Sequence, residues 1–219
     1  MKANMPTPVF TPDDEPYLGR ELLFQFDSLI CSCLELNSTC APATHDRPLS
    51  QLQRALCILV PQTISLALSA RELICQGYLL GAKVLVRPLA ERTVTMLYLC
   101  ISPDGLRVWE DGWNYKKRPS LQGMVEYLNK GPLQQDATGR VLKGFTHELN
   151  SATHGDPLSA QWNVILSEDG TPCHPVSKNL TSPQLADEIC SDVIPWLVAT
   201  MGIMSATFGH VAHASGKPN

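Results

Sequence analysis

Apolar residues recur at spacings of three and four along most of the chain, which is the pattern of amphipathic helices. This periodicity predicts long helices at residues 17–36, 49–76, 79–101 and 182–210. The segment 79–101 is apolar around most of its circumference, so we expect it to be the central helix with little exposed surface. Pro61 and Pro88 fall inside two of these segments, and we expect each ring to bend its helix.

Shorter elements fill the stretches between the long helices. Short helices are expected at residues 103–113 and around residues 124–128, as a cap over the bundle. A further helix is expected at 138–154, where Gly155 and Pro157 stop it. Alternating apolar residues at 162–166, followed by Asp169-Gly170, predict a small β-hairpin before the last helix. The predicted fold class is therefore mainly all-α, a helical bundle with a β-hairpin insertion.

The length and composition favour one domain. A chain of 219 residues that is 44% hydrophobic can bury one substantial core but not two large ones. Residues 1–16 contain four prolines and an acidic run, so we expect a flexible N-terminal arm. The expected single helical-bundle domain covers residues 17–213, and residues 214–219 are expected to be a disordered tail.

Net charge and cysteine usage bear on the ligands of the protein and on its cellular compartment. The net charge of −4 gives no global basic footprint for nucleic acid, although a local cationic groove is compatible with it. The eight cysteines form no Cys-x-x-Cys pair and lie mostly in apolar helical stretches, so they are interpreted as reduced core thiols. With no cationic secretory segment at the start of the sequence, this predicts a cytoplasmic protein.

The last helix raises the question of a membrane. No charged residue occurs between Asp192 and Lys217, and about 20 apolar residues suffice to cross a bilayer. Pro195, Thr200 and Ser205 dilute the apolar character, and no cluster of positive residues flanks the segment. We therefore expect a buried terminal helix and no membrane partner.

Two pairs of polar residues are candidates for chemistry. Arg87 and Glu91 lie four residues apart in the apolar central helix, and Asn150 and His154 have the same spacing at a helix end. Residues four apart share one face of a helix, and histidine transfers protons readily near neutral pH. Purely structural roles are also open. Arg87 and Glu91 can pair with each other as a buried ion pair that bridges two helices, and the second pair can form local hydrogen bonds or place a favourable charge at a helix end. No glycine-rich phosphate loop and no metal-ligand spacing is present, so neither a cofactor nor a metal site is predicted.

These motifs resemble a known group of proteins. A long helix with the sequence Leu-Val-Arg-Pro-Leu-Ala-Glu at residues 85–91, and a later helix that ends with Leu-Asn-Ser-Ala-Thr-His-Gly-Asp-Pro at residues 149–157, is similar to a bacterial family of unknown function. That family is in turn similar to HEPN-like helical proteins, and the resemblance covers residues 49–157. It implies a helical bundle. Active HEPN ribonucleases dimerise so that two Arg-Asn-x-x-x-His motifs form one metal-free site that cleaves RNA.

The resemblance and the residues leave two functions open. In this chain Asn150 and His154 match the family motif, but Leu149 occupies the arginine position. A first hypothesis is a non-enzymatic or regulatory module, in stress or phage defence, that binds a partner protein or a nucleotide-like ligand. The alternative is a metal-independent ribonuclease or toxin that acts as a homodimer on RNA, in which Arg87 replaces the missing arginine and Glu91 holds it. Arg140 and His147 offer a second, lower-ranked register.

Overall fold

The computed structural model describes residues 15–45, 47–130, 149–151, 153–154, 162, 164–167, 169–173 and 178–214. Several expectations lie outside these residues: the arm up to residue 14, residues 138–148 of the expected helix, its stop at Gly155 and Pro157, and the tail after residue 214. Arg140 and His147 lie outside them too. Glu15, which we assigned to the arm, is hydrogen-bonded to Arg71 at 2.9 Å and so belongs to the folded body.

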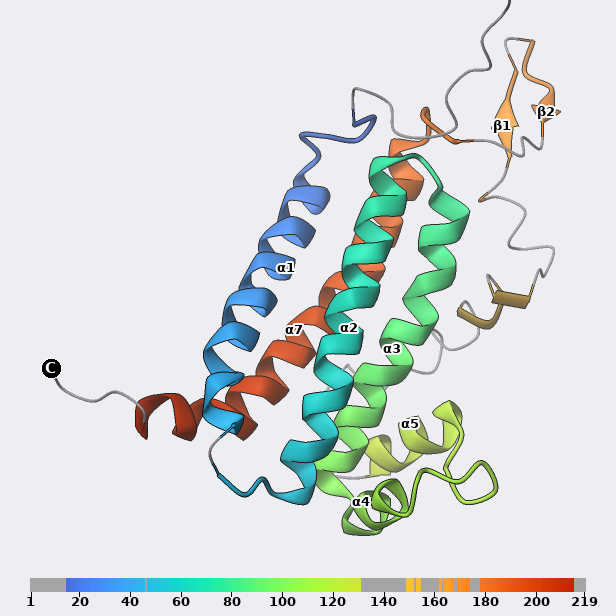
Figure 1. Cartoon of the computed structure of the whole chain (residues 1–219). Coiled ribbons are helices and arrows are strands. Elements are labelled where there is room, and N and C mark those ends of the chain that lie inside the picture. The colour runs from blue at the N-terminus through green and yellow to red at the C-terminus, as the bar shows by residue number, and fades with distance from the viewer. Residues whose placement is uncertain are drawn as a thin grey trace, which may run out of the picture.

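Four long helices form a bundle (Figure 1). They are α1 (Glu21–Cys40), α2 (Gln51–Cys75), α3 (Leu79–Ile101) and α7 (Pro183–Ala214). Helix α7 runs diagonally behind the others and contacts all three of them, whereas α2 packs along α3. Two short helices, α4 (Pro103–Glu110) and α5 (Leu121–Lys130), pack against α3 at one end of the bundle. The prediction of a mainly α protein is confirmed.

The helix boundaries follow from local chemistry. Ser50 and Gln53 form a reciprocal capping box at the start of α2, and the Ser102 hydroxyl accepts a hydrogen bond from the Gly105 amide at the start of α4. Helix α1 begins at Glu21 and ends at Cys40, about four residues later at each end than we predicted. A 3₁₀ turn, η1 (Pro42–Thr44), follows it. Helices α2, α3 and α7 continue through Pro61, Pro88 and Pro195.

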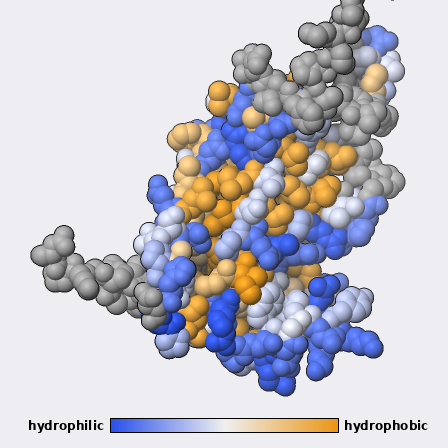
Figure 2. Space-filling view, in the orientation of Figure 1, coloured by the Kyte–Doolittle hydropathy of each residue, from blue (hydrophilic) through white to orange (hydrophobic). Residues whose placement is uncertain are grey.

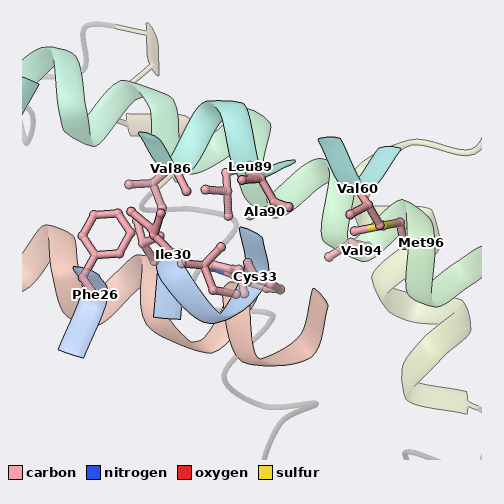
Figure 3. Close-up of a cluster of buried hydrophobic side chains, with 14 of the residues drawn as sticks. Phe26, Ile30, Cys33, Val60, Val86, Leu89, Ala90, Val94 and Met96 are labelled. Carbon is pink, nitrogen blue, oxygen red and sulfur yellow. The ribbon is translucent and has the colours of Figure 1, made fainter. Parts of the chain in front are cut away.

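Helix α1 shows where the periodicity misled. Leu18 falls on the apolar stripe of the helix predicted at residues 17–36, but it lies in a turn before the observed helix and is 72% exposed. Phe26 and Cys33 do face the core, together with Ile30. They pack with Val86 and Leu89 of α3 in the cluster shown in Figure 3. The periodicity therefore predicted the buried residues correctly within α1, but not in the turn before the helix begins.

The expected hairpin is represented by two very short strands. Strands β1 (Ile165–Leu166) and β2 (Pro172–Cys173) pair antiparallel, with Ile165 opposite Cys173 and Leu166 opposite Pro172. The turn between them includes Gly170, which has a φ of 81°. Glycine adopts this conformation without strain. Two residues per strand add no sheet layer, so the bundle alone forms the core.

Two helices are long and apolar enough to cross a membrane: Gln51–Cys75 and Pro183–Phe208. Within the bundle, 39% and 44% of their most apolar windows are buried. In α7 the buried side chains include Val193, Leu197 and Met204, which belong to the common core with α1 and α3. The last helix therefore supplies one wall of that core.

The cysteines are only partly core residues. All eight are free thiols, but Cys31, Cys57 and Cys100 are exposed, which corrects the expectation of core thiols for these three. Burial raises the pKa of Cys33 to about 11. For Cys190, burial and then the nearby Asp187 carboxylate raise the pKa to about 12.

Alkylation should separate these thiols. At pH 8 iodoacetamide should label the exposed Cys31 before Cys33 and Cys190, because the latter two are buried and their raised pKa keeps them in the unreactive thiol form. Peptide mass spectrometry over a time course measures the order. Early labelling of Cys190 in the folded chain would contradict this packing.

The turn at Gly77 should be a sensitive point of the fold. Gly77 has a φ of 80°, and an added Cβ would lie 2.6 Å from Leu180 Cδ2 and 2.9 Å from the Asn179 carbonyl oxygen. Gly77→Ala should lower the free energy of unfolding by about 1–3 kcal/mol, as measured by urea denaturation. The matched control is Gly202→Ala in α7, where nothing lies within 4 Å and no positive φ occurs. It should leave stability unchanged or raise it, because alanine favours helix.

Candidate functional site

Arg87 and Glu91 occupy successive turns of α3. The Arg87 Nε–H donates a hydrogen bond to Glu91 Oε1 at 3.0 Å. Their side chains are 23% and 39% exposed, so the pair borders solvent and lies within one helix. Arg87 and Glu91 therefore pair with each other, as the structural alternative expected, but the pair is only partly buried and does not bridge two helices. The pair instead presents a guanidinium and a carboxylate at the surface of the bundle.

His154 reaches this pair from a distant part of the sequence. Arg87 Nη1 lies 2.9 Å from His154 Nε2, although 67 residues separate the two. A guanidinium only donates hydrogen bonds, so the imidazole Nε2 must be the acceptor and the ring proton sits on Nδ1. The His154 residue is exposed. The contact therefore places the His154 imidazole against a permanent positive charge in reach of solvent.

Asn150 is close in sequence but is not joined to this group. Residues 149–151 and 153–154 are helical, and Leu149 is buried with only 1% of its surface exposed, whereas Asn150 is exposed. Among the residues that the structure describes, no hydrogen bond joins the Asn150 amide to Arg87, Glu91 or His154. The structure thus brings together three of the four candidates. An arginine at position 149 would point into the core rather than toward this site.

A second polar group, which sequence reasoning missed, lies one turn earlier on α3. Lys83 is only 3% exposed, and its ammonium group is paired with Asp192 of α7 and lies 3.6 Å from the Glu188 carboxylate. It also stands 4.4 Å from the centre of the Trp162 ring, which is a cation–π contact. Lys83, Arg87 and Glu91 follow one another at four-residue spacing, and this spacing was a signal in the sequence. We refer to Lys83, Asp192, Glu188 and Trp162 as the lysine cluster.

The lysine cluster sets the position of the site. It connects α3 to α7 and to Trp162, which follows the His154 segment in the sequence. The short helical segment with His154 lies beside α3 in Figure 1. One face of α3 therefore anchors the chain on both sides of residues 155–161.

The arrangement suits an anionic group better than a metal ion. Arg87 has five N–H donors, of which the Nε–H and one on Nη1 are used toward Glu91 and His154. Planar guanidinium donors match the oxygens of phosphate and carboxylate. Within the described parts of the chain, no group of three histidine, cysteine, aspartate or glutamate side chains gathers to hold a metal.

Comparison with known proteins adds a family of unknown function. The family DUF5677 matches residues 53–154, a span that contains Arg87 and Glu91 and ends at His154. The resemblance to a family of unknown function is confirmed over this span, which lies within the residues 49–157 that carried it. No curated protein and no solved structure matches the chain.

The lysine cluster should be important for stability. Lys83→Met removes the ammonium group and leaves the Asp192 carboxylate, 17% exposed, without its buried cation. The free energy of unfolding should fall by about 3 kcal/mol, because the Asp192 carboxylate loses its closest cation in a poorly solvated place. The matched variant Lys83→Met/Asp192→Leu should recover part of this loss, as urea denaturation would show. A double variant less stable than Lys83→Met would contradict the role of the ion pair.

Proposed function

We propose that the chain is a metal-independent ribonuclease in which Arg87 and His154 carry the reaction. The observation that supports this most directly is the 2.9 Å contact between the Arg87 guanidinium and the exposed His154 imidazole. A phosphate-binding cation and a proton acceptor are the two groups that RNA transesterification needs. The related proposals are an HEPN-like relation, a cytoplasmic location and action as a homodimer.

The proposed reaction uses each group once. On binding of RNA, the Arg87 Nη1–H shifts its hydrogen bond from His154 Nε2 to a phosphoryl oxygen. The freed Nε2 accepts the proton of the ribose 2′-hydroxyl, and the 2′ oxygen attacks phosphorus. The bond from phosphorus to the 5′ oxygen breaks, water supplies a proton to that oxygen, and His154 returns its proton to solvent. The products are a 2′,3′-cyclic phosphate and a 5′-hydroxyl. Arg87 stabilises the negative charge that develops on the phosphoryl oxygens, and Glu91 holds the guanidinium in place.

The position of Arg87 supports a substitution in space. Because Leu149 is a core residue, position 149 does not supply the arginine of the Arg-Asn-x-x-x-His motif. Arg87 brings a guanidinium to the same imidazole from α3. We infer that Arg87 supplies the positive charge that position 149 does not.

A second function is favoured by a different observation. Glu91 already neutralises Arg87, and Asn150 stands apart from the group. Both facts favour a non-enzymatic module that binds a nucleotide-like ligand at the same place without cleaving it. Both functions require binding of the ligand at Arg87. Only the ribonuclease also requires His154, for the cleavage step that follows binding.

Cleavage of end-labelled RNA by the purified chain in EDTA tests the proposal. We expect products with 2′,3′-cyclic phosphate ends. His154→Ala should lower the rate about 100-fold or more, because it removes the general base. Arg87→Ala should lower it about 100-fold, because it removes charge stabilisation of the transition state. The matched control is His45→Ala, an exposed histidine after η1, which should retain full activity.

The outcomes separate the two functions. RNA or nucleotide binding that depends on Arg87, without cleavage, would favour the non-enzymatic module. Cleavage that survives His154→Ala in a folded variant, or that His45→Ala also abolishes, would contradict the ribonuclease. Expression should give the same ranking: growth arrest by the natural sequence and none by His154→Ala.

A further inference from the structure

The loop between α4 and α5 carries a compact positive surface on an otherwise acidic chain. Lys116, Lys117 and Arg118 are consecutive and exposed, whereas the whole chain has a net charge of −4. Tyr115 precedes them and is 82% exposed, which is unusual for a large aromatic side chain. We call residues Tyr115, Lys116, Lys117 and Arg118 the basic loop. Figure 2 shows the end of the molecule formed by α4, α5 and their connection as a hydrophilic surface.

Backbone hydrogen bonds hold the basic loop in one shape. The Asn114 carbonyl accepts from the amides of Lys117 at 2.8 Å and Arg118 at 2.9 Å. The Asn114 side-chain oxygen accepts from the Lys116 amide at 3.0 Å. Immediately before it, the Trp113 ring packs on Trp109 with 5.2 Å between ring centres. The three cations are therefore presented by a closed turn whose base is attached to α4.

The aromatic ring and the charges lie together. The Arg118 guanidinium lies over the Tyr115 ring at 5.5 Å from its centre. An exposed aromatic face beside arginine and lysine side chains is the combination that binds single-stranded nucleic acid: the bases stack on the ring and the cations contact phosphates. A site that bound only phosphate groups would not require the Tyr115 ring.

Nearby acidic residues leave this charge largely intact. The Glu110 carboxylate is paired with Arg54 and Gln51 of α2, and Asp104 lies 3.5 Å from Arg107 within α4. Only Asp111 lies between α4 and the loop without such a pairing in the described structure. The segment 111–118 holds three cations and one carboxylate and so keeps a net charge of +2.

The basic loop is connected to α3 through α5. It leads into α5, which packs on α3 through Met124 at 3.8 Å from the Thr95 hydroxyl. Thr95 in turn bonds to the carbonyl of Glu91 at 2.7 Å, and it lies eight residues after Arg87. Eight residues of helix correspond to about 12 Å. This is the rise along α3 between Arg87 and Thr95, the residue that contacts α5.

We propose that the basic loop is a docking site for single-stranded RNA, which feeds a strand toward Arg87 and His154. This proposal rests on the ribonuclease function, but binding at the basic loop can be measured without cleavage. It names the substrate class of the site as single strands rather than duplex RNA. Stacking on Tyr115 requires unpaired bases, which a duplex does not offer.

The experiment uses a 2′-O-methyl RNA of twelve uridines, which lacks the nucleophilic hydroxyl, and measures Kd against salt by fluorescence anisotropy with the full chain. Lys116→Gln/Lys117→Gln/Arg118→Gln should weaken binding and reduce the slope of log K against log salt by about 2, at roughly 0.7 for each phosphate contact. Tyr115→Ala should weaken binding about tenfold without changing the slope, because it removes stacking and not charge. Arg47→Gln, an exposed cation in the loop before α2, is the control and should match the unmodified chain.

The outcomes separate the basic loop from the ribonuclease proposal. Loss of binding in the triple variant, with an unchanged slope in Tyr115→Ala, supports the docking site even if no cleavage of ordinary RNA is found. Binding that Arg47→Gln weakens as much as the triple variant would overturn it, since any cation would then suffice. Equal affinity for a duplex of the same length would overturn the assignment to single strands. Binding to anionic lipid vesicles but not to RNA would also overturn it.

Discussion

The ammonium group of Lys83 is the charge on which the arrangement around α3 depends. It is almost fully buried, and a buried ammonium group is stable only with partners close by. Those partners come from two other parts of the chain, Asp192 in α7 and the ring of Trp162. Because this one charge must be compensated, α3, α7 and the segment after His154 are held together. Thr93 and Thr200 add a buried hydroxyl contact at 3.2 Å between the same two helices.

The candidate site uses the next two turns of the same helix face. Lys83 is enclosed and structural, whereas Arg87 and Glu91 reach the surface and meet His154. Burial thus separates these charged residues: Lys83 supports the packing of the helices, whereas Arg87 and Glu91 are accessible to solvent. The hydrogen bonds to Glu91 and His154 limit how far the Arg87 guanidinium can move, which matters for any group that must stabilise a developing charge.

The two surfaces of the molecule that face a nucleic acid in our proposal differ in their chemistry. At Arg87 the positive charge is balanced by Glu91, so it offers directed hydrogen bonds more than a general attraction. The basic loop keeps its charge and adds an exposed ring. An acidic chain can bind RNA in this way because local charge, and not the total, sets the field that a nearby phosphate experiences at physiological salt.

The sequence by itself determined the helices, since the three-to-four periodicity, the Ser50 cap and the turn at Gly77 act over a few residues. It also determined that Arg87 and Glu91 share a face, because four-residue spacing on a helix requires it. Only the tertiary structure decided that His154 completes this pair, that Asn150 stands apart and that Lys83 is buried among partners from α7 and Trp162. The reason is that contacts across 67 or 109 residues depend on how whole helices pack, which no local pattern encodes.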